Sequence, residues 1–399
     1  MDSKHQNVYD LSDIRRKIDE VDEELSALFL RRMALCAEVA ASKKQTGKAV
    51  RDPARENAIV ERLTEGLSEK DKNAVDKLYR SIFTISRLSQ QEALAQSCAQ
   101  NALYEKLHAA LDRWDVFPTA PVVACQGVPG AYSEKACRTL FSEPDILYFK
   151  DFESVVKSVR TGLCRYGVLP FENSIHGSVT EVYDILSRSD VNVVRSVKLP
   201  IHHALLIPHG STLSDITEVY SHKQAIGQCS DFLSAHRSIK VNICENTATA
   251  AKLVSESGRR DLAAISSEGC AALYGLDVLK RDLQNSDINY TMFYCISKEL
   301  EICGEVDRAA FMFTLPNRAG TLADVLSRFA DKGINLVKIE SRPISGKDFE
   351  FMFYAEADCA VFDEALIRLL CESAGSLESF RFIGAYSEIS PDKGQHEGA

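Results

Sequence analysis

Two basic residues near the N-terminus occupy a helix face on which apolar residues are expected. Apolar residues recur with the spacing of a buried helix stripe up to Leu28 and again from Leu35, and Arg32 fills the slot between them. Lys43 follows eleven residues later, within about 20° of the same face and about 16 Å along the axis. A guanidinium at such a place calls for a planar anionic partner. The alternative is a basic pair that reaches water from a surface edge. Arg15 lies about 100° around the helix and cannot easily face the same pocket in its own chain, but it could reach a pocket in a second copy if the long helix pairs in a dimer.

A second set of candidate anion-binding features lies in the middle of the chain. Five apolar runs are each followed by a turn with small hydroxyl or amide side chains: GVPGAYS (127–133), ENSIHGS (172–178), SHKQA (221–225), NTATA (246–250) and ISS (265–267). Helix N-termini of this kind hold carboxylates with backbone N–H groups. One such turn alone is read as an ordinary helix cap, but five on one scaffold favour a cleft for a small anion. GVPG lacks the glycine spacing of a dinucleotide site.

The bulk composition narrows the class of protein. The 399 residues are 45% hydrophobic and 26% charged, with a formal net charge of −10, which argues against non-specific nucleic-acid binding. No apolar run is long enough to span a membrane. Twelve cysteines show no C-x-x-C pair, so we expect reduced thiols in a cytoplasmic protein without a metal site.

These candidate residues must be positioned by three kinds of structure. Residues 1–97 read as an all-helical domain with helices over about 11–44, from Asp52-Pro53, and about 69–96. A linker at 98–120 precedes an α/β domain at 121–298, where short β-branched runs alternate with helical patterns. Residues 305–388 read βαββαβ, the order of a ferredoxin-like α+β module.

The helical domain resembles the all-helical chorismate mutase family. IRRKIDEVD, RRMALCAEVAASK, VRDPARE and SRLSQQ carry the likeness. It implies a substrate site made of Arg32, Lys43, Asp52, Arg55, Glu56, Ser86 and Gln90, with Arg15 donated by a partner subunit. Asp52 is equally well explained as the cap of the second helix.

The chemistry of that family suits these residue types. Chorismate is a dianion that rearranges by a pericyclic route without a proton transfer or a nucleophile. A protein can therefore help by holding the substrate in a compact conformer and by stabilising the charge that develops on the ether oxygen. We expect arginines to clamp the carboxylates, and Lys43 and Gln90 to donate to the ether oxygen. Glu56 would hold the ring hydroxyl, in its protonated form if it donates elsewhere.

The α/β domain resembles the prephenate dehydratase family through GVPGAYS, LPFENSIHGSV, HHALLIP, VYSHKQAIGQC, NTATAA, ALYGL and NYTMF. The resemblance implies two lobes like those of periplasmic binding proteins, with the site between them. It assigns the departing hydroxyl to Thr291 and a polar lining to Glu172, Asn173, Ser221, His222, Gln228 and Thr247.

Two features of this second site need a chemical account. Threonine is a very poor acid, so we treat Thr291 as a positioned donor whose proton is supplied by a neighbour, with Glu172 as the candidate. The family usually has an arginine where this chain has Met292. Without that arginine, a substrate carboxylate needs a different cation, such as Lys223.

The C-terminal module resembles ACT domains through NRAGTLADVLSRFADKGINL and IESRP. The resemblance implies that phenylalanine binds at an ACT dimer interface and favours a less active state. The expected contacts are Gly320, Leu322, Asn335, Glu340, Ser341, Arg342 and Pro343. The alternative interpretation is a turn with a proline that blocks an edge strand. It explains Pro343 but not the whole Glu340–Pro343 stretch.

Together the three resemblances imply a feedback-regulated bifunctional enzyme of phenylalanine biosynthesis that converts chorismate to prephenate and prephenate to phenylpyruvate. We expect a homodimer or higher oligomer, no cofactor, no nucleic acid and no membrane. Two alternatives remain: a mutase joined to a prephenate dehydrogenase, for which no glycine fingerprint follows a strand, and a non-catalytic amino-acid sensor, which leaves the mutase cluster unexplained.

Overall fold

The structure is a computed structural model that describes residues 11–46, 52–94, 102–112, 117–286, 288–304, 306–344, 350–359, 362 and 364–390. It divides into two compact units. The first holds the N-terminal helices with residues 318–332 and 368–378, and the second holds 106–317, 333–367 and the chain from 379. Each unit is described by itself.

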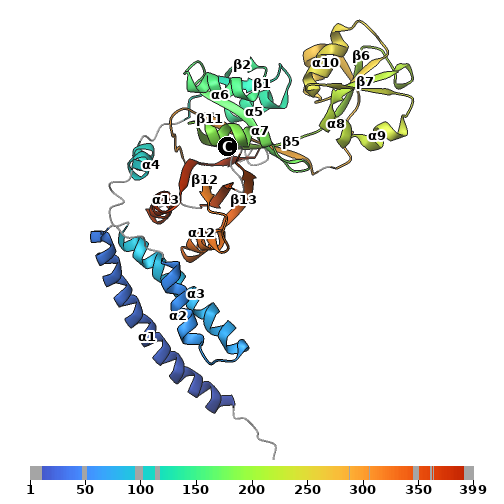
Figure 1. The fold of residues 1–399 in the computed structure, drawn as a ribbon. Coiled ribbons are helices and arrows are strands. Elements are labelled where there is room, and N and C mark those ends of the chain that lie inside the picture. The colour runs from blue at the N-terminus through green and yellow to red at the C-terminus, as the bar shows by residue number, and fades with distance from the viewer. Residues whose placement is uncertain are drawn as a thin grey trace, which may run out of the picture. The chain divides into compact units, whose positions relative to one another are not determined.

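Three helices form the N-terminal region, as the sequence predicts: α1 (Leu11–Thr46), α2 (Pro53–Thr64) and α3 (Glu69–Leu94). Figure 1 draws them in blue, with α1 as one long rod. The Asp52 side chain accepts a hydrogen bond from the backbone N–H of Arg55 at 3.1 Å, and Pro53 occupies the first turn. The cap reading of Asp52 is therefore confirmed.

The apolar stripe of α1 is not buried within one chain. Val21 and Leu28 are each 62% exposed. The other large apolar side chains that remain exposed along the helix are Leu11, Ile14, Ile18, Leu25, Leu30, Leu35 and Val39. Among the described elements, α3 is the one that packs extensively along α1, and the apolar side chains named above stay exposed. The apolar face that the sequence pattern predicts is therefore present on α1, and its large side chains are exposed in the single chain.

The α/β region is built on two sheets in separate lobes (Figure 1). The first has the order β16-β5-β11-β3-β1-β2, with β4 beside β3. Its strands are β1 (Val122–Gln126), β2 (Asp145–Phe149), β3 (Tyr166–Asn173), β4 (Gly177–Ser178), β5 (Asn192–Pro200), β11 (Tyr290–Ser297) and β16 (Glu388–Ile389). The second has the order β10-β6-β9-β7-β8, from β6 (Ala204–Pro208), β7 (Glu218–His222), β8 (Lys240–Cys244), β9 (Leu262–Ser266) and β10 (Leu276–Lys280).

Helices between these strands complete the lobes. They are α5 (Tyr132–Leu140), α6 (Phe152–Arg160), α7 (Thr180–Arg188), α8 (Lys223–Gln228), α9 (Ser230–Ala235), α10 (Thr247–Glu256) and α11 (Gly269–Tyr274), with a short 3-10 helix at Leu213–Asp215. Helix α4 (Ala102–Asp112) precedes β1. The chain leaves the first lobe after β5 and returns to it at β11. This is the two-lobed α/β arrangement that the sequence predicts.

The C-terminal module has the predicted βαββαβ order. Its elements are β12 (Arg308–Leu315), α12 (Thr321–Asp331), β13 (Leu336–Pro343), β14 (Phe351–Asp358), α13 (Glu364–Ser376) and β15 (Ser379–Tyr386), with the sheet order β13-β14-β12-β15. Gly320 precedes α12 with φ 88°, a left-handed conformation that favours glycine.

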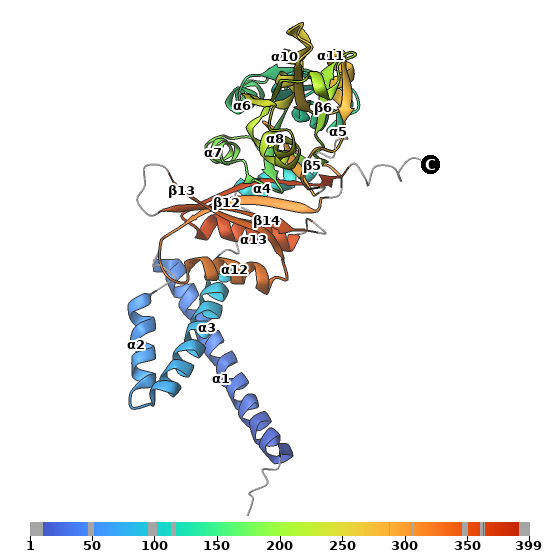
Figure 2. The same ribbon diagram turned by 90° about the vertical axis from the view of Figure 1, so that its right-hand side faces the viewer.

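The four-stranded sheet is packed directly against the first lobe. One hydrophobic core holds Phe171 and Tyr183 of the lobe together with Met312, Tyr354 and Tyr386 of the sheet. Figure 2 shows β13 and β14 beside α7. Just after β15, the short strand β16 pairs in parallel with β5, so the end of the module adds a strand to the sheet of the first lobe.

Two further properties bear on the class of protein. Across the part of the chain that is described, no helix combines the length and the apolar character that a membrane span needs. The described cysteines are all free thiols.

Candidate functional site

Arg32 leaves the apolar stripe and turns toward α3. Its guanidinium donates a hydrogen bond to the Ser86 hydroxyl and lies 5.6 Å from the centroid of the Phe83 ring. Its Nη1 atom is also 3.7 Å from the sulfur of Cys36. The side chain is half-buried. An arginine from the first helix and a hydroxyl from the last are thus brought together, as the mutase resemblance implies.

Ser86 and Gln90 form the buried floor of this cluster. Their exposed fractions are 3% and 8%. The Gln90 amide donates to the Ser86 carbonyl oxygen at 3.1 Å, one turn away on α3. Its Oε1 atom is buried and has no hydrogen-bond partner. Buried side-chain oxygens normally have a partner, so this one is suited to a ligand group that donates.

Glu56 has a partner that the sequence analysis did not include. Arg87 of α3 donates to its carboxylate at 2.8 Å, and both side chains are largely buried. This contact ties Glu56 of α2 to the helix that carries Ser86 and Gln90. The signal was available, because Arg87 stands next to Ser86 in SRLSQQ.

The remaining predicted mutase residues lie farther out. Lys43 is half-buried near the C-terminal end of α1, while Arg15, Asp52 and Arg55 are exposed. The structure therefore joins Arg32, Ser86 and Gln90 into one cluster and leaves Arg15 at the surface of its own chain.

The second candidate site begins with a pair of neighbouring strands. Thr291 on β11 stands opposite Asn173 on β3. The Asn173 amide donates to the Thr291 hydroxyl oxygen at 3.1 Å and to the Asn289 side-chain oxygen at 3.0 Å. Its own oxygen accepts the backbone N–H of His176 at 3.0 Å. The ENSIHGS turn thereby fixes the threonine that the sequence assigns to the leaving hydroxyl.

Gln228 from the second lobe closes the network. Its side-chain oxygen accepts from the Asn289 amide at 2.9 Å and lies 2.7 Å from Nε2 of His203. Its nitrogen is 3.3 Å from Nδ1 of His176. Burial lowers the pKa of the His203 imidazole, which favours a neutral ring whose Nε2–H donates to Gln228. Gln228 of the second lobe is thus linked through Asn289 to Asn173, the residue that bonds Thr291.

Three predicted residues flank this network at the carboxyl edge of the second sheet. Ser221 is fully buried, and its hydroxyl donates to the Ile265 carbonyl oxygen at 2.6 Å. His222 caps α8, and burial together with the nearby His176 lowers its pKa. Thr247 opens α10. Because β7 and β8 are parallel neighbours, their carboxyl ends lie at the same edge.

Glu172 lies on the other side of the first sheet. Successive strand residues point to opposite faces, and Glu172 pairs with Met292 while Asn173 pairs with Thr291. The Glu172 carboxylate contacts the ammonium group of Lys338. The hydroxyl of Thr291 therefore has Asn173 beside it, and the proton-supplying role expected of Glu172 stays a prediction.

The predicted regulatory residues divide between two surfaces. Glu340 accepts a hydrogen bond from the Ser178 hydroxyl, and Arg342 donates to the Thr180 hydroxyl at 3.3 Å. Ser341 and Pro343, which alternate with them, are exposed. Asn335 is exposed before β13, and Gly320 and Leu322 lie at the start of α12.

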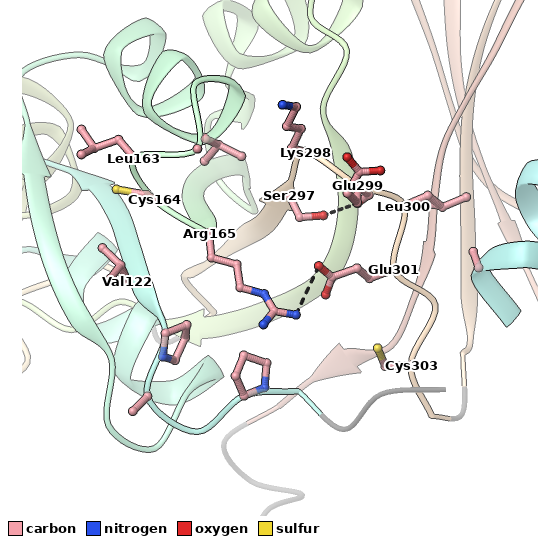
Figure 3. A pocket seen from close by; sticks show the side chains of 16 residues that line it. Val122, Leu163, Cys164, Arg165, Ser297, Lys298, Glu299, Leu300, Glu301 and Cys303 are labelled. Carbon is pink, nitrogen blue, oxygen red and sulfur yellow. Dashed lines mark hydrogen bonds and ion pairs between the residues drawn. The ribbon is translucent and has the colours of Figure 1, made fainter. Parts of the chain in front are cut away.

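A pocket of about 750 Å³ lies away from these residues (Figure 3). It is lined by the segment around Pro118–Pro121, by Arg165, and by residues 297–301 and Cys303, with Arg165 3.7 Å from Glu301. None of the predicted site residues lines it.

Comparison with known proteins agrees with the three-part organisation. Family models match the chorismate mutase type II domain at residues 14–91, prephenate dehydratase at 123–301 and the ACT domain at 310–369. The bifunctional chorismate mutase/prephenate dehydratase of Enterobacter agglomerans is 32% identical, over 94% of this chain and 95% of its own length.

Solved structures match the dehydratase and ACT regions. The prephenate dehydratase of Arthrobacter aurescens in complex with L-Phe is 26% identical, with a TM-score of 0.61, over 67% of this chain and 90% of that one. GqqA, described as a quorum quenching acylase, is 28% identical, with the same TM-score, over 67% of this chain and 98% of that one. Two differently named activities share this fold, so the fold alone does not decide between them.

The fold and the two clusters define a multidomain enzyme with a helical mutase domain, a two-lobed dehydratase domain and an ACT domain. The identity over nearly the whole chain specifies it further: the chain belongs to the bifunctional chorismate mutase/prephenate dehydratase family.

Proposed function

We propose that this chain performs two successive reactions of phenylalanine biosynthesis at separate sites. The helical domain rearranges chorismate to prephenate, and the two-lobed domain converts prephenate to phenylpyruvate. The observation that carries the proposal is the meeting of distant motif residues at Thr291, where Asn173 and, through Asn289, Gln228 of the other lobe converge.

At the first site we assign the substrate carboxylates to Arg32 and, from a partner subunit, Arg15. Ser86 already orients the Arg32 guanidinium, so the charge is held in place before substrate arrives. Lys43 and Gln90 would donate to the ether oxygen as its bond to the ring breaks. Asp52 and Arg55 would lie at the rim. Arg87 positions the Glu56 side chain, which would hold the ring hydroxyl.

At the second site the ring carboxylate departs as carbon dioxide, and its bonding electrons enter the ring as the C4 hydroxyl leaves. That hydroxyl departs as water, so one proton must be delivered to it. The Thr291 hydroxyl is oriented by Asn173 and would donate the hydrogen bond to the leaving oxygen. The proton itself would come from a neighbouring acid, the role for which Glu172 is the candidate. Gln228, Ser221, His222 and Thr247 would line the remaining polar surface.

The cation for a substrate carboxylate is assigned to Lys223. Met292 packs into the core between the first lobe and the ACT sheet, on the face opposite Thr291. Lys223 is exposed at the first turn of α8, where the helix dipole and its charge both favour an anion.

We further infer a homodimer that covers the exposed stripe of α1. The largest apolar patches on monomers are a few hundred Å², and nine large apolar side chains of one helix are exposed here. A second copy of α1 would bury them and bring Arg15 to the partner's Arg32. Phenylalanine is proposed as the allosteric ligand of the ACT module, and the cytoplasm as the location of the enzyme.

Incubation with chorismate alone tests the whole proposal. Phenylpyruvate should accumulate without any added nicotinamide cofactor, and prephenate should appear first. A mutase joined to a dehydrogenase would need a nicotinamide cofactor and make the hydroxylated keto acid. A sensor would leave chorismate unchanged, and either result would refute the assignment.

A further inference from the structure

Strand β13 presents its charged side chains inward and its apolar side chains outward. Lys338, Glu340 and Arg342 are half-buried, whereas Val337 and Ile339 are each 43% exposed. The three charged residues occupy alternate positions, so they share the sheet face that packs against the dehydratase lobe. An edge strand with this pattern is specified by polar partners across the junction rather than by apolar burial.

Each inward residue has a partner in one short segment of the lobe. Lys338 contacts Glu172, and Glu340 accepts a hydrogen bond from Ser178, which itself pairs with Glu172 across the β3–β4 hairpin. Arg342 reaches Thr180 and lies 3.6 Å from Asp184 of α7. Polar contacts thus connect β13 to the segment that begins with the ENSIHGS turn, and this turn contains Asn173.

Lys338 is the member of this row that contacts Glu172, the residue next to Asn173. Its side chain is only 17% exposed. Its ammonium group lies 5.0 Å from the Phe171 ring centroid and 5.5 Å from that of Tyr183. Aromatic faces attract a cation, so Glu172 and the two rings together hold the ammonium group in one position.

Glu356 is a second carboxylate on the same sheet face, opposite Lys338 in the strand register. It is 5% exposed and accepts hydrogen bonds from the phenols of Tyr294 and Tyr354. These donors satisfy Glu356 without the lysine, which leaves the Lys338 ammonium group to Glu172.

We propose that Lys338 is a positioning residue for the dehydratase reaction, supplied to the catalytic lobe by the ACT sheet. It fixes the Glu172 carboxylate on the far face of β3. Because Asn173 is the next residue, this contact also sets the direction of the amide that holds Thr291. The proposal rests on the assignment of the dehydratase site to Asn173 and Thr291.

The decisive experiment compares kcat and KM for supplied prephenate in the full-length protein. Lys338→Met and Lys338→Gln remove the charge in two different ways, so the test does not depend on one variant folding. Lys338→Arg keeps the charge. Lys252→Met is the matched control, because Lys252 forms a similar lysine–glutamate pair with Glu256 on the surface of α10.

Both neutral variants should lower kcat at least about ten-fold with little change in KM, since a small misplacement of a catalytic group costs that much. Lys338→Arg should recover most of the rate, and Lys252→Met should match the wild type. Mutase activity should not change. In a background that already carries Glu172→Gln, removal of the Lys338 charge should cost little more, because the two residues act as one unit.

Three results would overturn the proposal, and they are distinguishable. Neutral variants with wild-type kcat would refute the role of Lys338 while leaving the enzyme assignment intact. An additive loss in the double variant would show that Lys338 does not act through Glu172. A wild-type protein without dehydratase activity would instead refute the proposed function itself.

Discussion

The N-terminal helices and the dehydratase–ACT unit bury their apolar residues to very different degrees. On α1, Val21 and Leu28 are each 62% exposed, although both belong to a regular apolar stripe. At the junction of the ACT sheet and the first lobe, Phe171, Tyr294 and Tyr354 are completely buried. Full burial of a leucine or phenylalanine side chain stabilises a fold by about 1.5–3 kcal/mol. The dehydratase–ACT unit gains this stabilisation within one chain, whereas the exposed side chains of α1 do not.

The difference concerns how each site is completed. The proposed dehydratase network has its contacts within one chain, since Gln228 of the second lobe bonds Asn289 and Lys338 of the ACT sheet contacts Glu172. The mutase cluster holds Arg32, Ser86 and Gln90, but Arg15 remains exposed on its own helix. We infer that the first site is completed by another copy of the chain and the second by another domain of the same chain.

The sharpest way to separate the two sites is Thr291→Val. The substitution keeps the shape of the side chain and removes the donor that Asn173 orients. Dehydratase kcat should fall about 10³-fold, within the range for the loss of one positioned hydrogen-bond donor to a developing negative charge. Mutase activity should be unchanged. The control is Thr139→Val on the exposed face of α5, where the hydroxyl only bonds the preceding turn. A Thr291 variant that still makes phenylpyruvate at the parental rate removes Thr291 from the mechanism.

Arg32→Ala tests the other site. It removes the guanidinium held by Ser86, so mutase kcat/KM should fall about 10²-fold or more, as for the loss of a charge-assisted contact to an anion. Dehydratase activity on supplied prephenate should persist. Its neighbour Arg31 is exposed, and Arg31→Ala should have little effect. Loss of both activities in a folded Arg32 variant would contradict the separation of the sites.

Gly384→Ala tests whether the ACT sheet completes the catalytic lobe. A methyl group at Gly384 would lie 1.9 Å from the Val193 carbonyl oxygen on β5, so the sheet must shift. Overpacking of this kind costs about 1–3 kcal/mol. We expect a lower unfolding temperature of the dehydratase region, reduced dehydratase activity and an intact mutase. Gly375→Ala is the control, because nothing lies within 4 Å of its added methyl group. Equal stability of the two variants would argue against a close junction.

Subunit mixing tests the idea that a second copy completes the mutase. Arg15→Ala and Arg32→Ala should each inactivate it, but a mixed dimer restores one intact site from the two chains. Random exchange should recover about one quarter of the wild-type activity, because half of the dimers are mixed and each has one working site. No recovery after confirmed exchange would mean that Arg15 acts within its own chain.

The sequence predicted much of this arrangement, and its misses have physical reasons. Strand and helix order followed from local patterns, which is why the βαββαβ order and the Asp52 cap were recovered. The α1 stripe was read correctly as an apolar face, but spacing does not say whether the same chain or another one covers it.

The candidate sites show a second kind of limit. Asn173 and Thr291 lie in quoted motifs and do meet. Glu172 is in the same motif, but strand alternation turns it away from Thr291, and a one-residue difference in register is invisible without the sheet. Lys338 was missed because its partner is distant in sequence and lies in another domain. Arg87 and Asn289 were available as neighbours of predicted residues.

The smallest effect concerns acid stability, and it again separates the two regions. Burial lowers the pKa of His203 below its ordinary value of about 6.5. The unfolded chain therefore binds a proton that the folded chain excludes as the pH falls below about 6.5, and stability decreases. This group changes the free energy of unfolding by at most about 1.4 kcal/mol per pH unit.

The His203→Gln variant, which keeps a donor toward Gln228, tests this contribution. In urea titrations followed by dehydratase activity, it should flatten the dependence of stability on pH, whereas the mutase transition should not respond. An unchanged slope would mean that other groups, such as His222, govern the acid sensitivity of the lobe.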